Sequence, residues 1–467
     1  MRNSKTIWAP HAWLTINGRE EWHASVLLRI GNDGCWSEIE SGVNVPDGAE
    51  VLAGPLLPGM VNAHSHAFQR AFAGLAEIRS ADRDDFWTWR DRMYHVALRI
   101  TPEQQRAVAT WLNIEFLHGG YTHLCEFHYL HTQPDGRAYA DPLTMTRPLI
   151  DAAVDAGLGL TMIPVVYERA GFDVPTLRDD QRRFAQSATQ VWESATAIRN
   201  ARLPHIHSAI GIHSLRAATP DSIRELLRLA KDWDGPIHTH IAEQTGEVDA
   251  CQAATGSRPI EWLATEGLLD SRWQLVHATH TTPGELDLVA DSGAGVILCP
   301  TTEGNLGDGF CDFKGILERE IPFAMGSDSQ VGRAWHEELR LIEYVQRLKY
   351  RQRCLSAAPD RGQPSTASRL ASSLSKGGAR AAGFAKWGLT VGARADGLVA
   401  DANAAILAGV PCENWLDVLV FASPSRPWRD VLVAGKWAIR DHVHPHETTA
   451  RMAFENVMKS LWRIAVE

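Results

Sequence analysis

The stretch LLPGMVNAHSH, residues 56–66, decides the fold. An apolar run over residues 56–63 leads directly into His64 and His66, which predicts a short buried strand with two histidines at its end. Side chains two residues apart on a strand point to the same side, so both imidazoles can reach one metal ion. The alternative is an ordinary pair of polar residues at a strand end.

Seven more short apolar runs follow, most of them separated by amphipathic segments. The runs cover residues 122–127, 158–166, 208–213, 237–241, 274–278, 295–299 and 322–326. The helix-like segments include 102–118, 177–200, 220–233 and 283–292, and several open with Thr-Pro, which suits a helix N-terminus. Eight strands alternating with helices predict an α/β fold, a (β/α)8 TIM-type barrel. An open doubly wound sheet is the alternative, but the sequence lacks its glycine-rich phosphate-binding fingerprint after the first strand.

Both ends of the chain depart from this pattern. Residues 1–55 are rich in Trp and β-branched residues with turn signals at Asn17-Gly18 and 32–34, and residues near 390–440 repeat that style. We therefore expect a second, small β-sandwich domain built from both termini. The predicted boundaries are 1–57 for its N-terminal part, 58–385 for the barrel, and 386–467 for its C-terminal part with a helix over 448–466.

The composition is that of an ordinary globular protein, with 467 residues, 45% of them hydrophobic and 22% charged. The formal net charge of −10 argues against sequence-independent binding to nucleic acid or to anionic lipid. No apolar stretch is long enough to predict a membrane span. The 7 Cys are scattered without a Cys-x-x-Cys motif, which suits a reducing cytoplasm better than a disulfide framework. We expect a cytoplasmic protein.

Three later runs also end in residues that can bind a metal. His240 closes the fifth run, His277 closes the sixth, and Asp328 follows the eighth. In a barrel these positions lie on one rim, at the carboxyl ends of the strands, where the catalytic residues of this fold gather. Alone, Asp328 would be a common turn residue and His277 a buried histidine. Their joint placement with His64 and His66 predicts a metal site.

These motifs resemble the amidohydrolase superfamily, and the resemblance runs essentially end to end. It implies that the metal ligands are His64, His66, His240 and Asp328. Superfamily members with two metals bridge them with a carboxylated Lys on the fourth strand, but residues 208–213 contain no Lys, and neither does the chain from 6 to 230. One divalent metal per chain is therefore expected. Zn²⁺ suits this mixed N/O ligation with an open water position, and Fe²⁺ fits the same ligands.

The resemblance also implies separate catalytic roles for three residues. The metal lowers the pKa of its water, Asp328 accepts the water proton, and His277 holds the hydroxide or the developing charge. Glu243, just beyond His240, protonates the leaving nitrogen, as in mononuclear deaminases of the superfamily. The alternative for Glu243 is stabilisation of the next helix through its dipole.

Four other stretches are similar to the superfamily members that hydrolyse N-formimino-L-glutamate to N-formyl-L-glutamate and ammonia in histidine degradation. They are HAFQR at 66–70, DFWTWR at 85–90 in the long loop after the first strand, EFHY at 126–129 and HSLRA at 213–217. This substrate carries an amidine-like group and two carboxylates, so fixed cations and hydrogen-bond donors should surround it. The predicted substrate-binding residues are Gln69, Arg90, Tyr129, His213 and Arg216.

Some residues depart from this resemblance or allow another interpretation. Residues 210–214 read IGIHS where Ala-Pro is expected before His213, and 397–401 read GLVAD in place of the usual Asp-Leu-Val pattern. These departures affect the placement of His213 more than the reaction. Arg90 follows Trp87 and Trp89 and could instead be a packing or surface residue.

Two alternative functions stay open. A related mononuclear deaminase acting on guanine, an adenine derivative or a triazine would share the metal motifs but have a neutral, aromatic pocket. A non-catalytic scaffold of the same fold would typically lose metal ligands, and all four are present. The expected partner is a small anionic amidine, with neither nucleic acid nor membrane. Because superfamily relatives are often homodimers, a homodimer is a further expectation.

Overall fold

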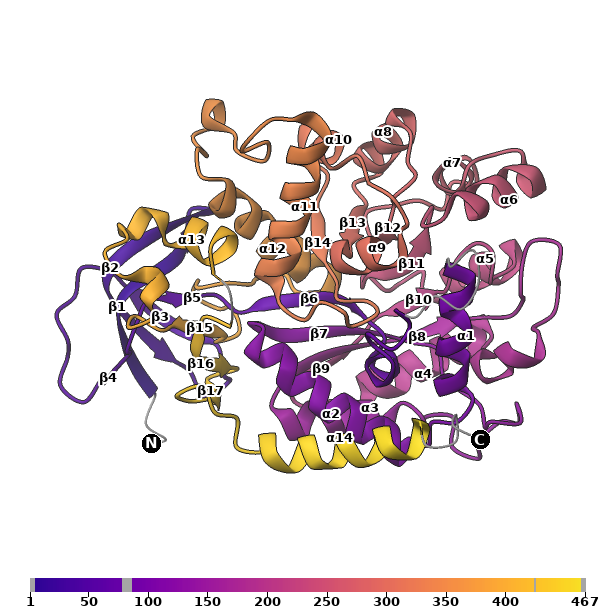
Figure 1. The fold of residues 1–467 in the computed structure, drawn as a ribbon, viewed down its shortest axis with the longest axis horizontal. Coiled ribbons are helices and arrows are strands. Elements are labelled where there is room, and N and C mark those ends of the chain that lie inside the picture. Colours follow the sequence, from indigo (N-terminus) through magenta and orange to yellow (C-terminus); the bar gives the residue numbers. More distant parts are fainter. Residues whose placement is uncertain (1–4, 78–85, 424–425, 463–467) are drawn as a thin grey trace.

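The computed structural model describes residues 5–77, 86–423 and 426–462, and Figure 1 shows two sheets within them. One is a parallel barrel, and the other is a separate sheet built from both ends of the chain. The predicted fold class is therefore confirmed. The exact domain boundaries stay predictions. None of the described helices is long and apolar enough to cross a lipid bilayer.

The barrel strands follow one another around the ring in chain order. Their bounds are β6 Met60–Ser65, β7 Tyr121–His128, β8 Gly159–Val166, β9 Ile206–Ser208, β10 Ile210–Ile212, β11 Ile237–Ile241, β12 Trp273–His277, β13 Gly295–Leu298 and β14 Phe323–Met325. β9 and β10 share the fourth position, because β9 pairs only with β8 whereas β10 pairs with both β8 and β11. The predicted runs from the second to the eighth each supply one position of the ring.

The first and last barrel strands close the ring at the predicted metal ligands. Ser65 and Asp328 form a parallel bridge, and the amides of Ser327 and Asp328 donate to the His64 carbonyl at 3.0 and 3.1 Å. The His66 amide donates in turn to the Asp328 carbonyl at 3.3 Å. Closing the barrel therefore brings these ligands together.

The second sheet has the strand order β17-β16-β15-β5-β1-β2-β3, with β4 beside β1. The bounds are β1 Lys5–Ile16, β2 Arg19–Ile30, β3 Trp36–Glu40, β4 Glu50–Val51, β5 Leu56–Leu57, β15 Gly397–Ala400, β16 Trp428–Val433 and β17 Lys436–Ile439. β5 from the N-terminal part pairs with β15 from the C-terminal part, which joins the two ends.

The prediction of one strand over residues 56–63 is wrong in detail. Leu56 and Leu57 belong to the second sheet, and the barrel strand begins only at Met60. Pro58 and Gly59 separate the two, since Pro interrupts a ladder. A Cβ at Gly59 would lie 2.2 Å from the Thr122 hydroxyl, so only glycine allows this close approach.

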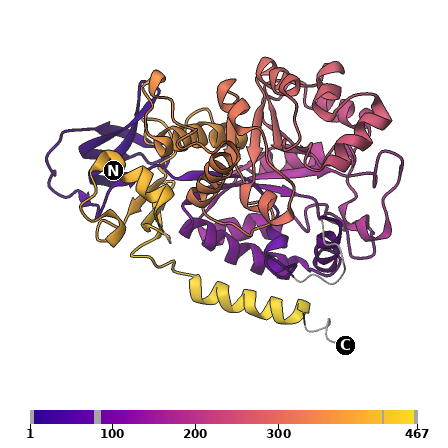
Figure 2. The same cartoon turned by 45° about the horizontal axis from the view of Figure 1, so that its top comes forward.

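The helices pack around the barrel, and Figure 2 shows the C-terminal helix α14 on its outside. The bounds are α1 Phe86–Ala97, α2 Pro102–His118, α3 Arg147–Ala156, α4 Ala188–Ala201, α5 Pro220–Leu229, α6 Thr245–Thr255, α7 Pro259–Thr265, α8 Pro283–Ser292, α9 Pro300–Leu306, α10 Phe313–Glu318, α11 Trp335–Tyr350, α12 Thr366–Ala382, α13 Trp415–Phe421 and α14 Glu447–Trp462, which packs on α2. The described part of the chain also contains the 3-10 helices η1 Ala67–Ala71, η2 Asp179–Phe184, η3 Pro359–Arg361, η4 Ala405–Leu407 and η5 Cys412–Asn414.

Threonine caps set the helix starts that the sequence predicts well. Thr101 and Thr282 accept hydrogen bonds from the backbone three residues on, ahead of a first-turn proline, and α2 and α8 match their predicted ranges. The helix predicted over 177–200 is wrong at its start: η2 comes first, and α4 begins only after the Ser187 cap. The helix predicted over 220–233 ends early, at Leu229.

A buried ion pair ties the amino end of the barrel to the second sheet. Arg394 donates two hydrogen bonds to Asp396, at 2.6 and 2.9 Å, and a third to the Thr122 carbonyl. Asp396 also accepts from the Ala434 amide at 2.8 Å. Arg394 Nη1 lies 3.0 Å from His123 Nδ1, and His123 Nε2 lies 2.8 Å from the Thr161 hydroxyl. Both charged groups and the His123 ring are thus hydrogen-bonded.

Candidate active site

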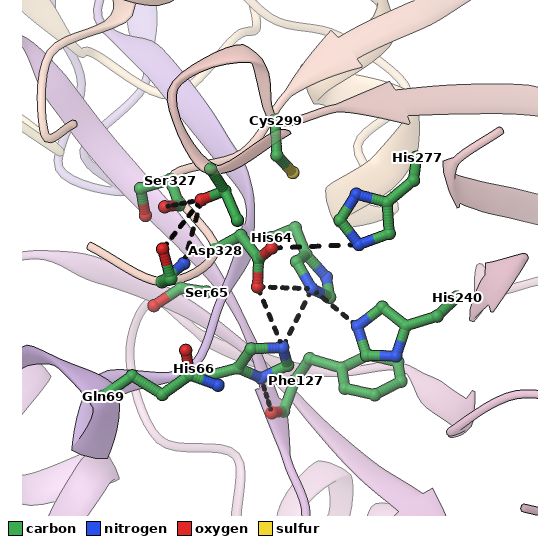
Figure 3. A network of polar contacts seen from close by, with 12 residues as sticks. His64, Ser65, His66, Gln69, Phe127, His240, His277, Cys299, Ser327 and Asp328 are labelled. Atoms are coloured by element: carbon green, nitrogen blue, oxygen red, sulfur yellow. Dashed lines mark hydrogen bonds and ion pairs between the residues drawn. The ribbon is translucent and has the colours of Figure 1, made fainter. Parts of the chain in front are cut away.

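Four buried side chains meet at the carboxyl end of the barrel. His64 Nε2 lies 3.1 Å from His66 Nε2 and 3.0 Å from His240 Nε2, and Asp328 Oδ1 is 3.6 Å from His64 Nε2 and 3.2 Å from His66 Nε2. Figure 3 shows the four groups facing one another. Ligand atoms around one tetrahedral ion stand roughly 3.5 Å apart, so these spacings fit a single metal ion.

The hydrogen bonds of the histidines fix which nitrogens face the centre. His66 Nδ1 lies 2.8 Å from the Phe127 carbonyl and His240 Nδ1 lies 2.9 Å from the His213 carbonyl, so each Nδ1 carries the hydrogen. Their Nε2 lone pairs then point at His64 Nε2, where one hydrogen could satisfy only one of the two contacts. Such convergent lone pairs call for a cation, and the donor set fits a divalent metal ion.

The pKa shifts within the cluster also support a metal site. Burial and the neighbouring imidazoles hold the pKa of His64 and of His240 well below the usual value, so both rings are neutral. Burial opposes ionisation of Asp328, but contact with His66 holds the pKa of its carboxyl below the usual range. Neutral imidazoles and an ionised carboxylate are the forms that bind metals.

The backbone around the cluster is strained. Five non-glycine residues here have positive φ: Ala242 at 52°, His277 at 73°, Ala278 at 48°, Asp328 at 45° and Gln330 at 69°. Each left-handed residue costs on the order of 1 kcal/mol or more, and such residues cluster at functional sites. They lie at or just after the ends of β11, β12 and β14, so the closed barrel holds the strain that positions the side chains.

His277 lies beside the cluster, surrounded by carboxylates. Its Nε2 is 3.7 Å from Glu243 Oε1 and 3.8 Å from Asp328 Oδ2, and its Nδ1 is 3.5 Å from Glu303 Oε1. Burial works against its charged form, but Glu243, Glu303 and Asp328 together raise the pKa of His277 to about 10. Burial also raises the pKa of Glu243. The site therefore pairs a cationic imidazole with a carboxyl that is able to carry a proton.

A pocket opens from this cluster, and all five predicted substrate-binding residues line it. These are Gln69, Arg90, Tyr129, His213 and Arg216. Gln69 Nε2 donates to the Tyr129 hydroxyl at 3.0 Å, while the buried Gln69 Oε1 has no hydrogen-bond partner among the described residues. Burial is the main cause that lowers the pKa of His213, and the charges of Arg216 and Arg90 add to it. Arg90 and Arg216 therefore line the same pocket as Glu243 and His277.

The prediction that DFWTWR lies in a loop is wrong for most of its length. α1 begins at Phe86, so Trp89 and Arg90 lie in its first turns, whereas Asp85 falls outside the described residues. Arg90 donates to the Tyr94 hydroxyl one turn further on and contacts that ring. A helix therefore holds Arg90 at the pocket.

Several residues of the pocket are not predicted by any sequence pattern. Tyr94, Tyr167 and Phe184 line the wall, and Gln181 donates to the Tyr167 hydroxyl at 3.0 Å. Nothing local in the sequence marks them. Glu303, which contacts His277, lies in α9, and its position in the first turn after the seventh predicted strand, near the rim, is a signal that could have marked it.

Comparisons with known proteins agree with this architecture. A sequence profile of the amidohydrolase family matches residues 56–438. The chain is 44% identical to the formimidoylglutamate deiminase of Pseudomonas aeruginosa over 95% of this chain and 97% of that one. It is 28% identical to a 5-methylthioadenosine/S-adenosylhomocysteine deaminase of Halobacterium salinarum, over 85% of each chain. The crystal structure of an amidohydrolase from Brucella melitensis superposes with a TM-score of 0.92 at 37% identity, covering 98% of this chain and 99% of that one.

Proposed function

This chain belongs to the amidohydrolase family, and we propose that it hydrolyses N-formimino-L-glutamate to N-formyl-L-glutamate and ammonia. It is a hydrolase of C–N bonds other than peptide bonds. The observation that carries the proposal is one pocket that is lined both by three members of the metal-ligand cluster, His66, His240 and Asp328, and by two arginines, Arg90 and Arg216. An amidine with two carboxylates needs both kinds of surface.

The metal that we propose is Zn²⁺, bound through Nε2 of His64, His66 and His240 and through Asp328 Oδ1. Three imidazoles and one carboxylate form a mixed nitrogen and oxygen set that suits zinc, and Fe²⁺ is the competing ion. When bound, the ion supplies an activated water as the nucleophile. Cys and Lys are absent from this ligand set, in agreement with a centre built for one ion.

The residues around the ion divide the proton transfers. Asp328 takes a proton from the attacking water, because its carboxylate is ionised in the buried site. His277, cationic and 3.8 Å from Asp328 Oδ2, stabilises the negative charge that develops on oxygen. Glu243 carries a proton to the leaving nitrogen, since burial raises the pKa of its carboxyl. Ammonia then departs as the C–N bond breaks.

We assign the two carboxylates of the substrate to the arginines of the pocket. Arg90 and Arg216 each present a guanidinium that can bind a carboxylate in a bidentate manner. The Tyr129 hydroxyl accepts from Gln69, so its own hydrogen is free to donate to the substrate, and Gln69 Oε1 can accept an N–H of the substrate. Because the protein carries a net charge of −10, this attraction for an anion has to be local.

A substrate panel tests this proposal. The purified protein is assayed for ammonia release from N-formimino-L-glutamate, N-formimino-L-aspartate, guanine, adenosine and a triazine. We expect the highest kcat/KM with formiminoglutamate and no ammonia release from the uncharged heterocycles. Turnover of guanine, adenosine or the triazine without turnover of formiminoglutamate would contradict the proposal. A cytoplasmic location and a homodimer accompany the proposed role as further predictions.

A further inference from the structure

A second group of potential metal ligands lies beside the first and shares one residue with it. The Cys299 sulfur, one His277 ring nitrogen and one Asp328 carboxylate oxygen lie within 4.8 Å of one another, and all three residues are buried. Figure 3 shows the Cys299 sulfur pointing toward the space between His277 and Asp328. We propose that these three residues form a second, inhibitory site for thiophilic divalent ions, Cd²⁺ or Zn²⁺ in excess.

The two oxygens of Asp328 face the two groups separately. Oδ1 lies toward His64 and His66, at 3.6 and 3.2 Å from their Nε2 atoms, whereas Oδ2 lies 3.8 Å from His277 Nε2. One carboxylate can therefore bridge two ions, each held by a different oxygen. The second site does not require the first to be vacated.

The surroundings of His277 prepare it as a ligand. Its Nδ1 lies 3.5 Å from Glu303 Oε1, and the Cys299 amide donates to the same oxygen at 2.9 Å. A carboxylate on Nδ1 is the usual partner of a metal-binding histidine, because it orients the ring and makes Nε2 a better donor. Glu303 thus links the backbone of Cys299 to the imidazole of His277 and sets their spacing.

The chemistry of the three donors selects the ion. A thiolate is soft and favours Cd²⁺ and Zn²⁺ over Mg²⁺ or Ca²⁺, which prefer oxygen. Ligand atoms around one tetrahedral ion stand roughly 3.5 Å apart, so the three residues need to move only slightly from separations within 4.8 Å. On binding, the ion takes the place of the thiol proton and of any proton on the His277 nitrogen that faces it, and the displaced protons pass to solvent.

Occupation of this site stops the proposed reaction. His277 and Asp328 Oδ2 would coordinate the second ion and could no longer stabilise charge or accept a proton. Cys299 itself has no part in the proposed proton transfers and packs among apolar residues of the barrel interior. Replacing it should therefore remove the inhibitory ion while leaving basal turnover.

Cadmium titration tests the proposal. The protein is loaded with one equivalent of zinc in a background in which the accessible Cys35, Cys354 and Cys412 are changed to Ser. CdCl₂ should bind as one further equivalent, produce the ultraviolet cadmium–thiolate absorption band and abolish ammonia release over the same concentration range. Cys299→Ala should lose the band, and its inhibition should need at least about tenfold more cadmium.

Cys311→Ala is the matched control, because Cys311 is also buried but is not one of the three ligands. It should retain both the band and the inhibition. A band or an inhibition that is unchanged in Cys299→Ala would overturn the proposal, as would cadmium that replaces zinc without a thiolate band. Metal content and absorbance do not depend on the proposed deiminase activity, so the two proposals can fail separately.

If Cys299→Ala does not fold, X-ray absorption at the cadmium edge identifies the atoms that bind cadmium in the protein with the three Ser substitutions. A sulfur ligand in the cadmium shell is expected there. A shell of nitrogen and oxygen alone would contradict the site.

Discussion

Both ends of the barrel contain buried histidines, but their partners differ. At the amino end, His123 accepts from Arg394 through Nδ1 and reaches the Thr161 hydroxyl through Nε2. At the carboxyl end, His64 Nε2 faces the Nε2 atoms of His66 and His240 at 3.1 and 3.0 Å. The first arrangement satisfies each nitrogen within the protein, and the second leaves lone pairs converging on one point.

This difference separates a structural cluster from a metal centre. At the amino end the neighbouring charges are of opposite sign and paired, as in Arg394 with Asp396, so the region can hold the barrel to the second sheet. At the carboxyl end the backbone has left-handed residues such as His277 and Asp328, and carboxylates crowd one imidazole. Such strain and unbalanced charge need a ligand to be stabilised. Substitutions at the two ends should therefore fail in different ways.

The largest effect is expected at the carboxyl end, from Asp328→Asn. The variant should fold, because the amide retains the shape of the side chain, but it loses the proton acceptor and a charged ligand. We expect kcat to fall by at least about 10³-fold. Steady-state ammonia release checks this, with circular dichroism and metal content as controls. A kcat near that of the unmodified protein would show that another group accepts the proton.

At the amino end, Arg394→Ala should lower stability and spare catalysis. Removing one partner leaves Asp396 buried without its countercharge, which costs about 3–5 kcal/mol. Urea unfolding monitors the loss, and the folded fraction should keep its kcat. The matched control is Arg228→Ala, which breaks an exposed ion pair with Glu225 and should leave the urea unfolding midpoint almost unchanged. If both variants lost the same free energy of unfolding, the buried pair would not have the structural role assigned to it.

Removing the metal should also distinguish the two ends. Dialysis against a chelator should abolish turnover, and zinc should restore it. Because the ion binds the native state, its loss should lower the free energy of unfolding by about 3–4 kcal/mol when zinc had been present at several hundred times its Kd. Hydrogen exchange should increase at the strand ends around Asp328 and stay unchanged around His123. A uniform increase through the barrel would contradict a localised centre.

The smallest of these effects is expected for Arg216→Ala. Loss of one charge-assisted contact to a carboxylate should cost about 1.5–3 kcal/mol, which corresponds to a KM roughly 10- to 100-fold higher. The value of kcat should change little, since Arg216 does not reach the reacting carbon in the proposed mechanism. Arg224→Ala, at an exposed ion pair on α5, serves as the control. An unchanged KM would mean that the carboxylate is held elsewhere.

Local patterns were enough to predict much of the fold and the cluster. The apolar run before His64 and His66 predicts both a strand and its ligands, because residue spacing on a strand determines which side chains face the same way. Thr-Pro pairs fixed the start of α2 for the same local reason. The barrel then brings strand ends together, so His240 and Asp328 could be placed without further information.

The details that were missed depend on contacts between distant residues. Leu56 and Leu57 join the second sheet because β15, more than 300 residues later, offers a partner. Arg394 also lacks a local signal, since its partner His123 lies 271 residues away in sequence. Arg90 was expected in a loop because aromatic residues hide its helical pattern, and its contact with Tyr94 becomes visible only on a helix.

The most direct test of the central claim is a metal titration of activity. Metal-free protein is given increasing zinc, and ammonia release from N-formimino-L-glutamate is measured against bound metal. We predict a linear rise that ends at one equivalent per chain, with no activity at zero metal. Full turnover without metal, or activity that appears only with a second equivalent, would contradict a single-ion deiminase centre at His64, His66, His240 and Asp328.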